Sequence, residues 1–163
     1  MSIREAIHRF RELHEEYKSG AFKSPDALRF YETERDDFLR AYLEAQRLVM
    51  RPGQSPRQAL RVSAAVNLEL QFGPRQESAK TVDLATAGFA AIVATPIAMR
   101  IVCDFVLGIA PQPVRGKARV VACTRDGSGA YRTSFSIETM SNEDRARLEI
   151  LVIDTALGPP PKR

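Results

Sequence analysis

The 163-residue sequence contains no tryptophan, only two histidines and only two cysteines. Histidine is the usual proton shuttle and a common metal ligand near neutral pH, so its scarcity argues against extensive acid–base or metal chemistry. Cys103 and Cys123 lie in apolar runs without a CxxC partner, and we interpret both as small buried hydrophobic residues in a reducing compartment. We therefore expect no disulfide, no metal and no cofactor.

Long hydrophobic runs without charges are also missing. The most apolar segment, residues 88–111, carries Arg100 and Asp104 near its middle and Pro96 within it. Two charges at that depth would be costly in a bilayer, so we expect no membrane insertion. Met1 leads directly into a charged, helix-patterned stretch, which predicts a cytoplasmic protein without a signal peptide.

The charge is distributed unevenly along the chain. Residues 1–50 hold nine Lys/Arg and ten Asp/Glu, a net charge of −1, whereas residues 51–163 hold fifteen and ten, a net charge of +5. The basic character of the second part favours an anionic partner there. A nucleic acid, a nucleotide and an acidic protein all fit this pattern.

Residues 1–50 predict a helical hairpin that extends the N-terminus of the main domain. Ser2 and Glu5 have the spacing of a capping box, and apolar residues then recur at helical spacing at Ile3, Ala6, Ile7, Phe10, Leu13 and Tyr17. Ser24-Pro25-Asp26 predicts the start of a second helix, whose apolar stripe comprises Leu28, Tyr31, Phe38, Tyr42, Ala45 and Val49.

The apolar face of this hairpin needs a cover, and the adjoining domain and a second copy in a homodimer fit equally well. A protein partner bound through these helices is a third possibility. His8 and His14 lie six residues apart, which does not place two metal ligands on one helix face. We predict that both are exposed.

Residues 51–56, Arg-Pro-Gly-Gln-Ser-Pro, predict a linker that leads into a domain over residues 57–163. Beyond the linker, apolar residues alternate without a miss over residues 62–72, which predicts one long strand. Further strands are predicted at residues 80–84, 89–94, 101–107, 114–125 and 131–138. A tight turn at residues 126–129 joins the last two strands, and a closing helix begins after Ser141 or Asn142.

Six short strands followed by a helix predict an α+β fold, in which a small six-stranded antiparallel β-barrel has the C-terminal helix near one end. The sequence contains no GxSxG, HExxH, Walker or GxGxxG pattern, and it pairs no nucleophile with a plausible base. We therefore do not expect an enzyme.

Two motifs favour ligand binding instead. Arg57 and Arg61 stand four residues apart at the entrance to the first strand, and Asp83-Leu-Ala85-Thr-Ala-Gly88 follows twenty-two residues later. Arginine stays charged and donates two parallel hydrogen bonds to phosphates or to a guanine edge. The carboxylate of Asp83 can accept hydrogen bonds from N1–H and the exocyclic amine of guanine, and a glycine lets the backbone approach a ligand closely.

Arg-x-x-x-Arg before a first strand, with Asp/Asn-x-Ser-x-x-Gly after a second, resembles the paired signature of PilZ domains over residues 55–157. The resemblance implies a bacterial receptor for the second messenger cyclic di-GMP, often bound as an intercalated dimer. It implies that Arg57 and Arg61 clamp the ligand, that Asp83 accepts from guanine, and that Gly88 permits close approach. Ligand binding would fold the arginine loop onto the barrel and reposition the helical segment.

Two residues depart from this family pattern. Ala85 stands where the family usually has a serine, and the missing hydroxyl removes one hydrogen bond, about 0.5–1.5 kcal/mol or about a tenfold loss of affinity at most. Arg132, in the last strand, lies close to where many relatives have a glycine. The sequence does not decide whether Arg132 clashes with the ligand or supplies another cation.

Two other functions fit parts of the pattern. A degenerate PilZ-like adaptor would keep the fold without binding nucleotide and act through protein–protein contacts. A nucleic-acid binder would use a basic stripe on residues 114–125, formed by Arg115, Lys117, Arg119 and Arg125. No aromatic residues interleave with this stripe, so we predict an ordinary solvated strand face and do not expect nucleic acid as a partner.

Overall fold

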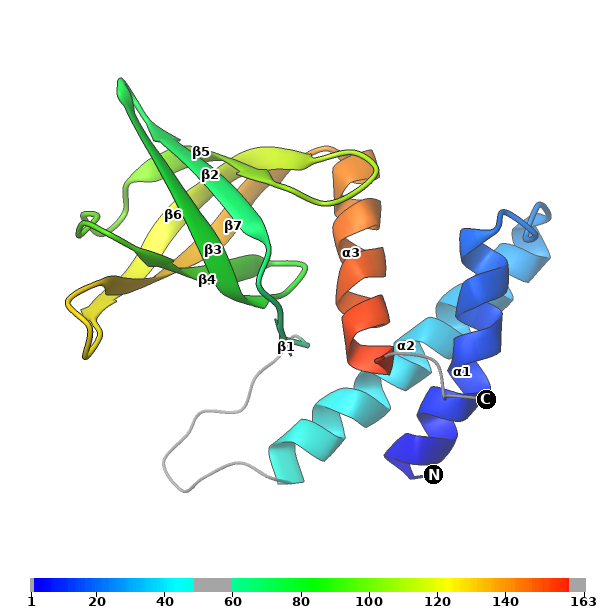
Figure 1. Cartoon of the computed structure of the whole chain (residues 1–163). Helices are drawn as coiled ribbons and strands as arrows, with labels where there is room; N and C mark the ends of the chain where they lie inside the picture. Colours follow the sequence, from blue (N-terminus) through cyan, green and yellow to red (C-terminus); the bar gives the residue numbers. More distant parts are fainter. Residues whose placement is uncertain (1, 49–59, 159–163) are drawn as a thin grey trace. The chain divides into compact units, whose positions relative to one another are not determined.

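The computed structural model describes residues 2–48 and 60–158, which form parts of two compact units, Met1–Leu60 and Arg61–Arg163 (Figure 1). The predicted linker at residues 51–56 lies outside the described residues, so its bounds stay a prediction. None of the described helices is both long enough and apolar enough to cross a membrane.

The first unit contains two helices, α1 (Ile3–Lys18) and α2 (Pro25–Leu48). The predicted capping box is confirmed, since the Ser2 side chain accepts a hydrogen bond from the Glu5 N–H and Glu5 accepts one from the Ser2 N–H. Ser24 caps α2 by accepting a hydrogen bond from the Ala27 N–H at 3.1 Å. The sequence therefore places both helix starts correctly.

Stacked aromatic rings form the core between α1 and α2. Phe10 is 2% exposed and stacks on Phe38 with 4.9 Å between ring centroids, while Tyr17 stacks on Tyr31 at 3.9 Å. Leu28, at the start of the predicted stripe, remains 37% exposed. The helical pairing thus depends on few, large side chains.

The prediction that both histidines are exposed is wrong for His14, which is fully buried. His14 lies four residues after Phe10 and three before Tyr17, so it falls on the apolar face of α1. Its Nδ1 lies 2.9 Å from the Tyr31 hydroxyl, and its ring stacks on Phe10. A polar partner on α2 therefore compensates for the burial of the imidazole.

The second unit is a closed antiparallel barrel with one added strand. Its strands are β1 (Val62–Ser63), β2 (Asn67–Phe72), β3 (Arg75–Leu84), β4 (Gly88–Val93), β5 (Val102–Leu107), β6 (Val114–Arg125) and β7 (Tyr131–Met140). The sheet order is β1-β3-β2-β5-β6-β7-β4, and pairing of β3 with β4 closes a six-stranded ring to which β1 is added on β3. The predicted barrel is confirmed.

The predicted continuous strand over residues 62–72 is wrong, because it divides into β1 and β2. Both pair with β3, but in registers that differ by one residue. At the break, the hydroxyl of Thr81 donates to the Ala64 carbonyl at 2.6 Å and accepts from the Val66 N–H at 2.9 Å. A side chain on β3 thus replaces the missing backbone hydrogen bonds.

We expect Thr81→Val to destabilise the barrel by about 1–3 kcal/mol, since it leaves a half-buried carbonyl and a half-buried N–H without partners. Urea unfolding of the full chain measures this change. Thr124→Val, at an exposed position of β6, is the matched control and should change stability by no more than about 0.5 kcal/mol. Equal effects of the two substitutions would contradict the role assigned to the Thr81 hydroxyl.

A polar turn and a helix complete this unit. The carboxylate of Asp126 accepts hydrogen bonds from the Ser128 hydroxyl and from backbone N–H groups of Ser128 and Ala130, and these bonds lower the pKa of Asp126. The helix α3 (Asn142–Leu157) is capped by Ser141 and contacts β1 and β6. Figure 1 shows it in orange beside the barrel. The predicted turn and closing helix are both confirmed.

The barrel interior is filled by alternating side chains of the strands, and Leu68, Leu70, Leu107 and Val120 are at most 1% exposed. Cys103 is buried among them as predicted, and burial raises the pKa of its thiol to about 11. Cys123 is half-buried, and both cysteines are free thiols.

Candidate ligand-binding site

The turn between β3 and β4 brings most of the predicted site residues together. Asp83 is the penultimate residue of β3 and Gly88 the first of β4, and the Ala85 N–H closes the turn by donating to the Gly88 carbonyl at 2.8 Å. Arg61 directly precedes the Val62–Leu84 pair of β1 and β3, so its backbone lies at this same end of the barrel. Arg57 lies outside the described residues.

Asp83 is the most polar feature of this turn region. Its side chain is 13% exposed, and its Oδ2 accepts a hydrogen bond from Arg132 Nη2 at 2.9 Å. Its Oδ1 is buried and has no hydrogen-bond partner among the described residues. A buried acceptor without a partner is costly, so this carboxylate has acceptor capacity that the described part of the chain does not fill.

Arg132 was not among the predicted site residues, although the sequence singled it out. It lies 49 residues from Asp83. Two pairings bring them together: β4 pairs with β3 on one side, Asp83 opposite Ala90, and with β7 on the other, Ile92 opposite Arg132. The structure places the Arg132 side chain on the Asp83 carboxylate, so Arg132 supplies a cation at this site. Only the strand order could have revealed this contact.

Gly88 is required by the packing of the barrel itself. A Cβ at this position would lie 2.3 Å from the backbone carbonyl oxygen of Phe135 on β7, which is too close for any side chain. The sequence motif predicts that the backbone at Gly88 approaches a ligand closely. In the structure, this backbone closely approaches the neighbouring strand β7. Ala85 is 3% exposed, so its methyl group lies buried within the turn region.

The predicted basic stripe on β6 does not form one continuous row. The β6–β7 register shifts between Val120 and Ala122, so Cys123 lies opposite the buried Thr133 and Arg125 opposite Tyr131. Directly opposed side chains share a face, and Arg125 therefore leaves the face that carries Arg119.

Acidic partners compensate two members of this stripe. Arg119 hydrogen-bonds Glu138, which raises the pKa of Arg119 and lowers that of Glu138, and Lys117 lies 3.9 Å from Asp104. These ion pairs favour the solvated strand face that the sequence predicts. They weaken the case for a phosphate-binding stripe.

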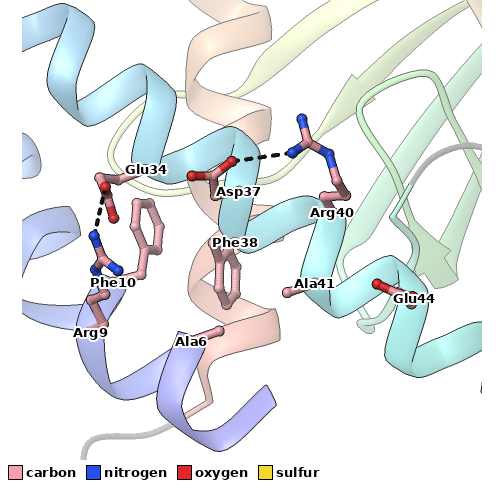
Figure 2. Close-up of a pocket in the computed structure, with 9 residues that line it drawn as sticks. All are labelled: Ala6, Arg9, Phe10, Glu34, Asp37, Phe38, Arg40, Ala41 and Glu44. Carbon is pink, nitrogen blue, oxygen red and sulfur yellow. Dashed lines mark hydrogen bonds and ion pairs between the residues drawn. The ribbon is translucent and has the colours of Figure 1, made fainter. Parts of the chain in front are cut away.

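Two hollows are lined by residues other than Asp83. Figure 2 shows one of about 270 Å³ between α1 and α2, where Phe10 and Phe38 lie among charged residues, including the Arg9–Glu34 pair at 3.0 Å and the Arg40–Asp37 pair at 3.3 Å. The other, about 590 Å³ and open, lies on the outside of β5, β6 and β7. We place the candidate site at Asp83 because its buried Oδ1 has no hydrogen-bond partner among the described residues, which indicates that a donor is missing there. The size of the two hollows does not enter this choice.

Four large hydrophobic residues of the barrel unit are exposed, near the start of β5 and at the register shift of β6. They are Met99, Ile101, Val102 and Val121, which are 39–56% exposed. Backbone hydrogen bonds of Val120 with Arg100 and Ile101 hold the two segments together.

No family model matches the sequence, and no curated protein matches it. Solved structures do match in fold. The inhibitor of motility MotI/DgrA of Bacillus subtilis matches with a TM-score of 0.56 at 15% identity, over 64% of this chain and 55% of that one. The PilZ domain, with c-di-GMP, of YcgR from Escherichia coli matches with a TM-score of 0.53 at 14% identity, over 62% and 92%.

The apo structure of MrkH from K. pneumonia matches with a TM-score of 0.52 at 17% identity, over 66% of this chain and 53% of that one. This chain therefore spans about half the length of the MotI/DgrA and MrkH chains. The fold of the barrel unit is that of PilZ domains, as the sequence resemblance predicts.

Proposed function

We propose that this chain is a non-enzymatic bacterial receptor that binds cyclic di-GMP at the β3–β4 end of its barrel. The observation that carries the proposal is the buried Oδ1 of Asp83, which has no partner among the described residues at the barrel end where Arg61 also lies. The PilZ fold of the unit and the order of the two motifs support the same function.

In this proposal, each group has a distinct chemical task. Asp83 accepts from N1–H and the exocyclic amine of one guanine, a donor pair that adenine does not present. Arg57 and Arg61 donate charge-assisted hydrogen bonds to phosphates or to a guanine edge. Ala85 contributes no hydroxyl, so affinity depends on the three charged groups.

The signal would pass through the chain between the two units. Ligand binding folds the segment that carries Arg57 and Arg61 onto the barrel, because the clamp needs both arginines at the ligand. The ligand then selects one arrangement of the helical unit out of those the linker permits. The free energy available for this selection is the difference in ligand affinity between the arrangements.

Titration calorimetry with cyclic di-GMP tests the proposal. We expect wild type to bind, and Arg57→Ala, Arg61→Ala and Asp83→Ala each to weaken binding by about 10- to 100-fold, because each removes a charge-assisted hydrogen bond of about 1.5–3 kcal/mol. Asp104→Ala is the matched control, since it removes the same charge from an exposed position on β5. Binding that is absent in wild type, or unchanged in all three variants, contradicts the proposal.

A ligand-free adaptor is the second candidate function. The Asp83–Arg132 ion pair favours it, because the carboxylate already has one internal partner. The exposed Leu28 and Phe30 of α2 offer a contact surface. This function predicts no heat with cyclic di-GMP, together with a protein partner that the full chain retains and a chain lacking residues 1–50 loses.

A further inference from the structure

We propose that Arg132 is an internal competitor of the ligand: it holds the Asp83 carboxylate in the free protein and releases it when guanine binds. The inference rests on the proposed function and concerns the regulation of the same site. It assigns control of the affinity of the site to a residue outside both motifs, whereas the base selectivity remains with Asp83.

The chemistry of the two donors is alike. A guanidinium group offers parallel N–H donors on an N–C–N unit, and guanine offers N1–H and its exocyclic amine on an N–C–N unit of the same geometry. Both suit the two oxygens of one carboxylate. Arg132 Nη2 already donates to Asp83 Oδ2 at 2.9 Å, so it occupies part of the surface that guanine requires.

The internal contact is incomplete. Arg132 bonds Oδ2, while Oδ1 stays buried without a partner among the described residues. A guanine edge would satisfy both oxygens and remove the penalty of the unfilled acceptor. The exchange therefore favours the ligand, although the free protein has a contact that must first break.

The exposure of the two partners shows which of them can move. Both residues belong to strands paired on both sides, but the side chain of Asp83 is 13% exposed, whereas that of Arg132 is 48% exposed. An arginine this exposed returns to water at low cost, because ion pairs at the surface contribute little. Asp83 stays in place and Arg132 leaves.

A ligand binds only those molecules in which the competitor has left the site, so its apparent affinity is the intrinsic affinity multiplied by the fraction of free sites. Removing it without changing Asp83 should therefore strengthen binding. We expect Arg132→Gln to tighten cyclic di-GMP binding by about two- to fivefold, as measured by titration calorimetry on the full chain. The variant loses a cation, so any phosphate contact made by Arg132 would produce the opposite change.

Cyclic di-AMP separates these effects. Adenine does not offer the donor pair that Asp83 accepts, so Arg132→Gln should not improve the binding of this analogue. Arg115→Gln is the charge-matched control. Arg115 is exposed on β6 and lies opposite Val106, whereas Arg132 lies opposite Thr124, nine residues further along β6. It should not tighten either ligand. Circular dichroism and thermal unfolding establish that both variants are folded.

The outcomes distinguish the inference from the function on which it rests. Tighter cyclic di-GMP binding by Arg132→Gln alone, without a gain for cyclic di-AMP, supports the competitor. Unchanged or weaker cyclic di-GMP binding by Arg132→Gln, with wild type still binding, overturns the competitor and leaves the receptor intact. No binding by either protein contradicts the receptor itself, and the inference with it.

Discussion

Replacing Gly88 with alanine is expected to destabilise the barrel by about 3 kcal/mol or more, at the upper end of what overpacking costs. The added Cβ would lie 2.3 Å from the Phe135 carbonyl oxygen and 3.4 Å from its carbonyl carbon. Both are backbone atoms of β7, which pairs with β4 from Gly88 to Val93. The neighbour cannot rotate away as a flexible side chain would, so strands must separate.

Urea unfolding of the full chain measures this loss. Gly127→Ala is the matched control, because a Cβ there meets nothing within 4 Å, and it should change stability little. Gly116 lies outside both motifs, yet a Cβ there would lie 2.4 Å from the Thr139 carbonyl oxygen. A similar loss in Gly116→Ala would show that strand packing, and not the motif as such, requires these glycines. A Gly88→Ala barrel as stable as the control would refute this account.

Phe10→Ala is expected to remove about 3–5 kcal/mol of stability from the helical unit, the usual cost of deleting a buried phenylalanine. Phe10 is 2% exposed and stacks on three rings, with centroid distances of 4.9 Å to Phe38, 5.5 Å to His14 and 5.6 Å to Tyr31. A unit with so few large core residues has little stability in reserve. We therefore expect α1 and α2 to lose their packing.

Amide hydrogen exchange of the full chain, followed separately over residues 3–48 and 61–158, measures this effect. Protection should fall in the helices, while the barrel should remain protected. Phe30→Ala removes the same side chain from an α2 position that is 55% exposed, and it should leave protection nearly unchanged. Equal loss in both variants would indicate that helix propensity, rather than the aromatic core, holds the unit together.

The sequence predicts elements best where their signals are local. The caps at Ser2, Ser24 and Ser141 and the turn at residues 126–129 each depend on residues within four positions, and all are confirmed. The strand at residues 114–125 has the predicted bounds for the same reason, since alternation is read along one segment. The burial of His14 could also have been predicted, because its spacing from Phe10 and Tyr17 places it on the apolar face of α1.

Contacts between segments far apart in the sequence could not be predicted from local patterns. The break between β1 and β2 depends on Thr81 in a partner strand, and the displacement of Arg125 depends on a register shift against β7. In the candidate site, Asp83, Ala85 and Gly88 lie at one turn because they are close in sequence, and their role in binding a ligand stays a prediction. The Asp83–Arg132 pair needed the order of three strands, which no single segment contains.

The amino-acid sequence was sufficient to predict the helical hairpin, the closed barrel and the polar residues worth testing, because periodicity, capping and turn chemistry act within a few residues. It did not predict the break between β1 and β2. The tertiary structure alone decided which oxygen of Asp83 is occupied and which carbonyl lies against Gly88. These contacts arise from strand register across the closed sheet, where residues far apart along the chain come within hydrogen-bonding distance.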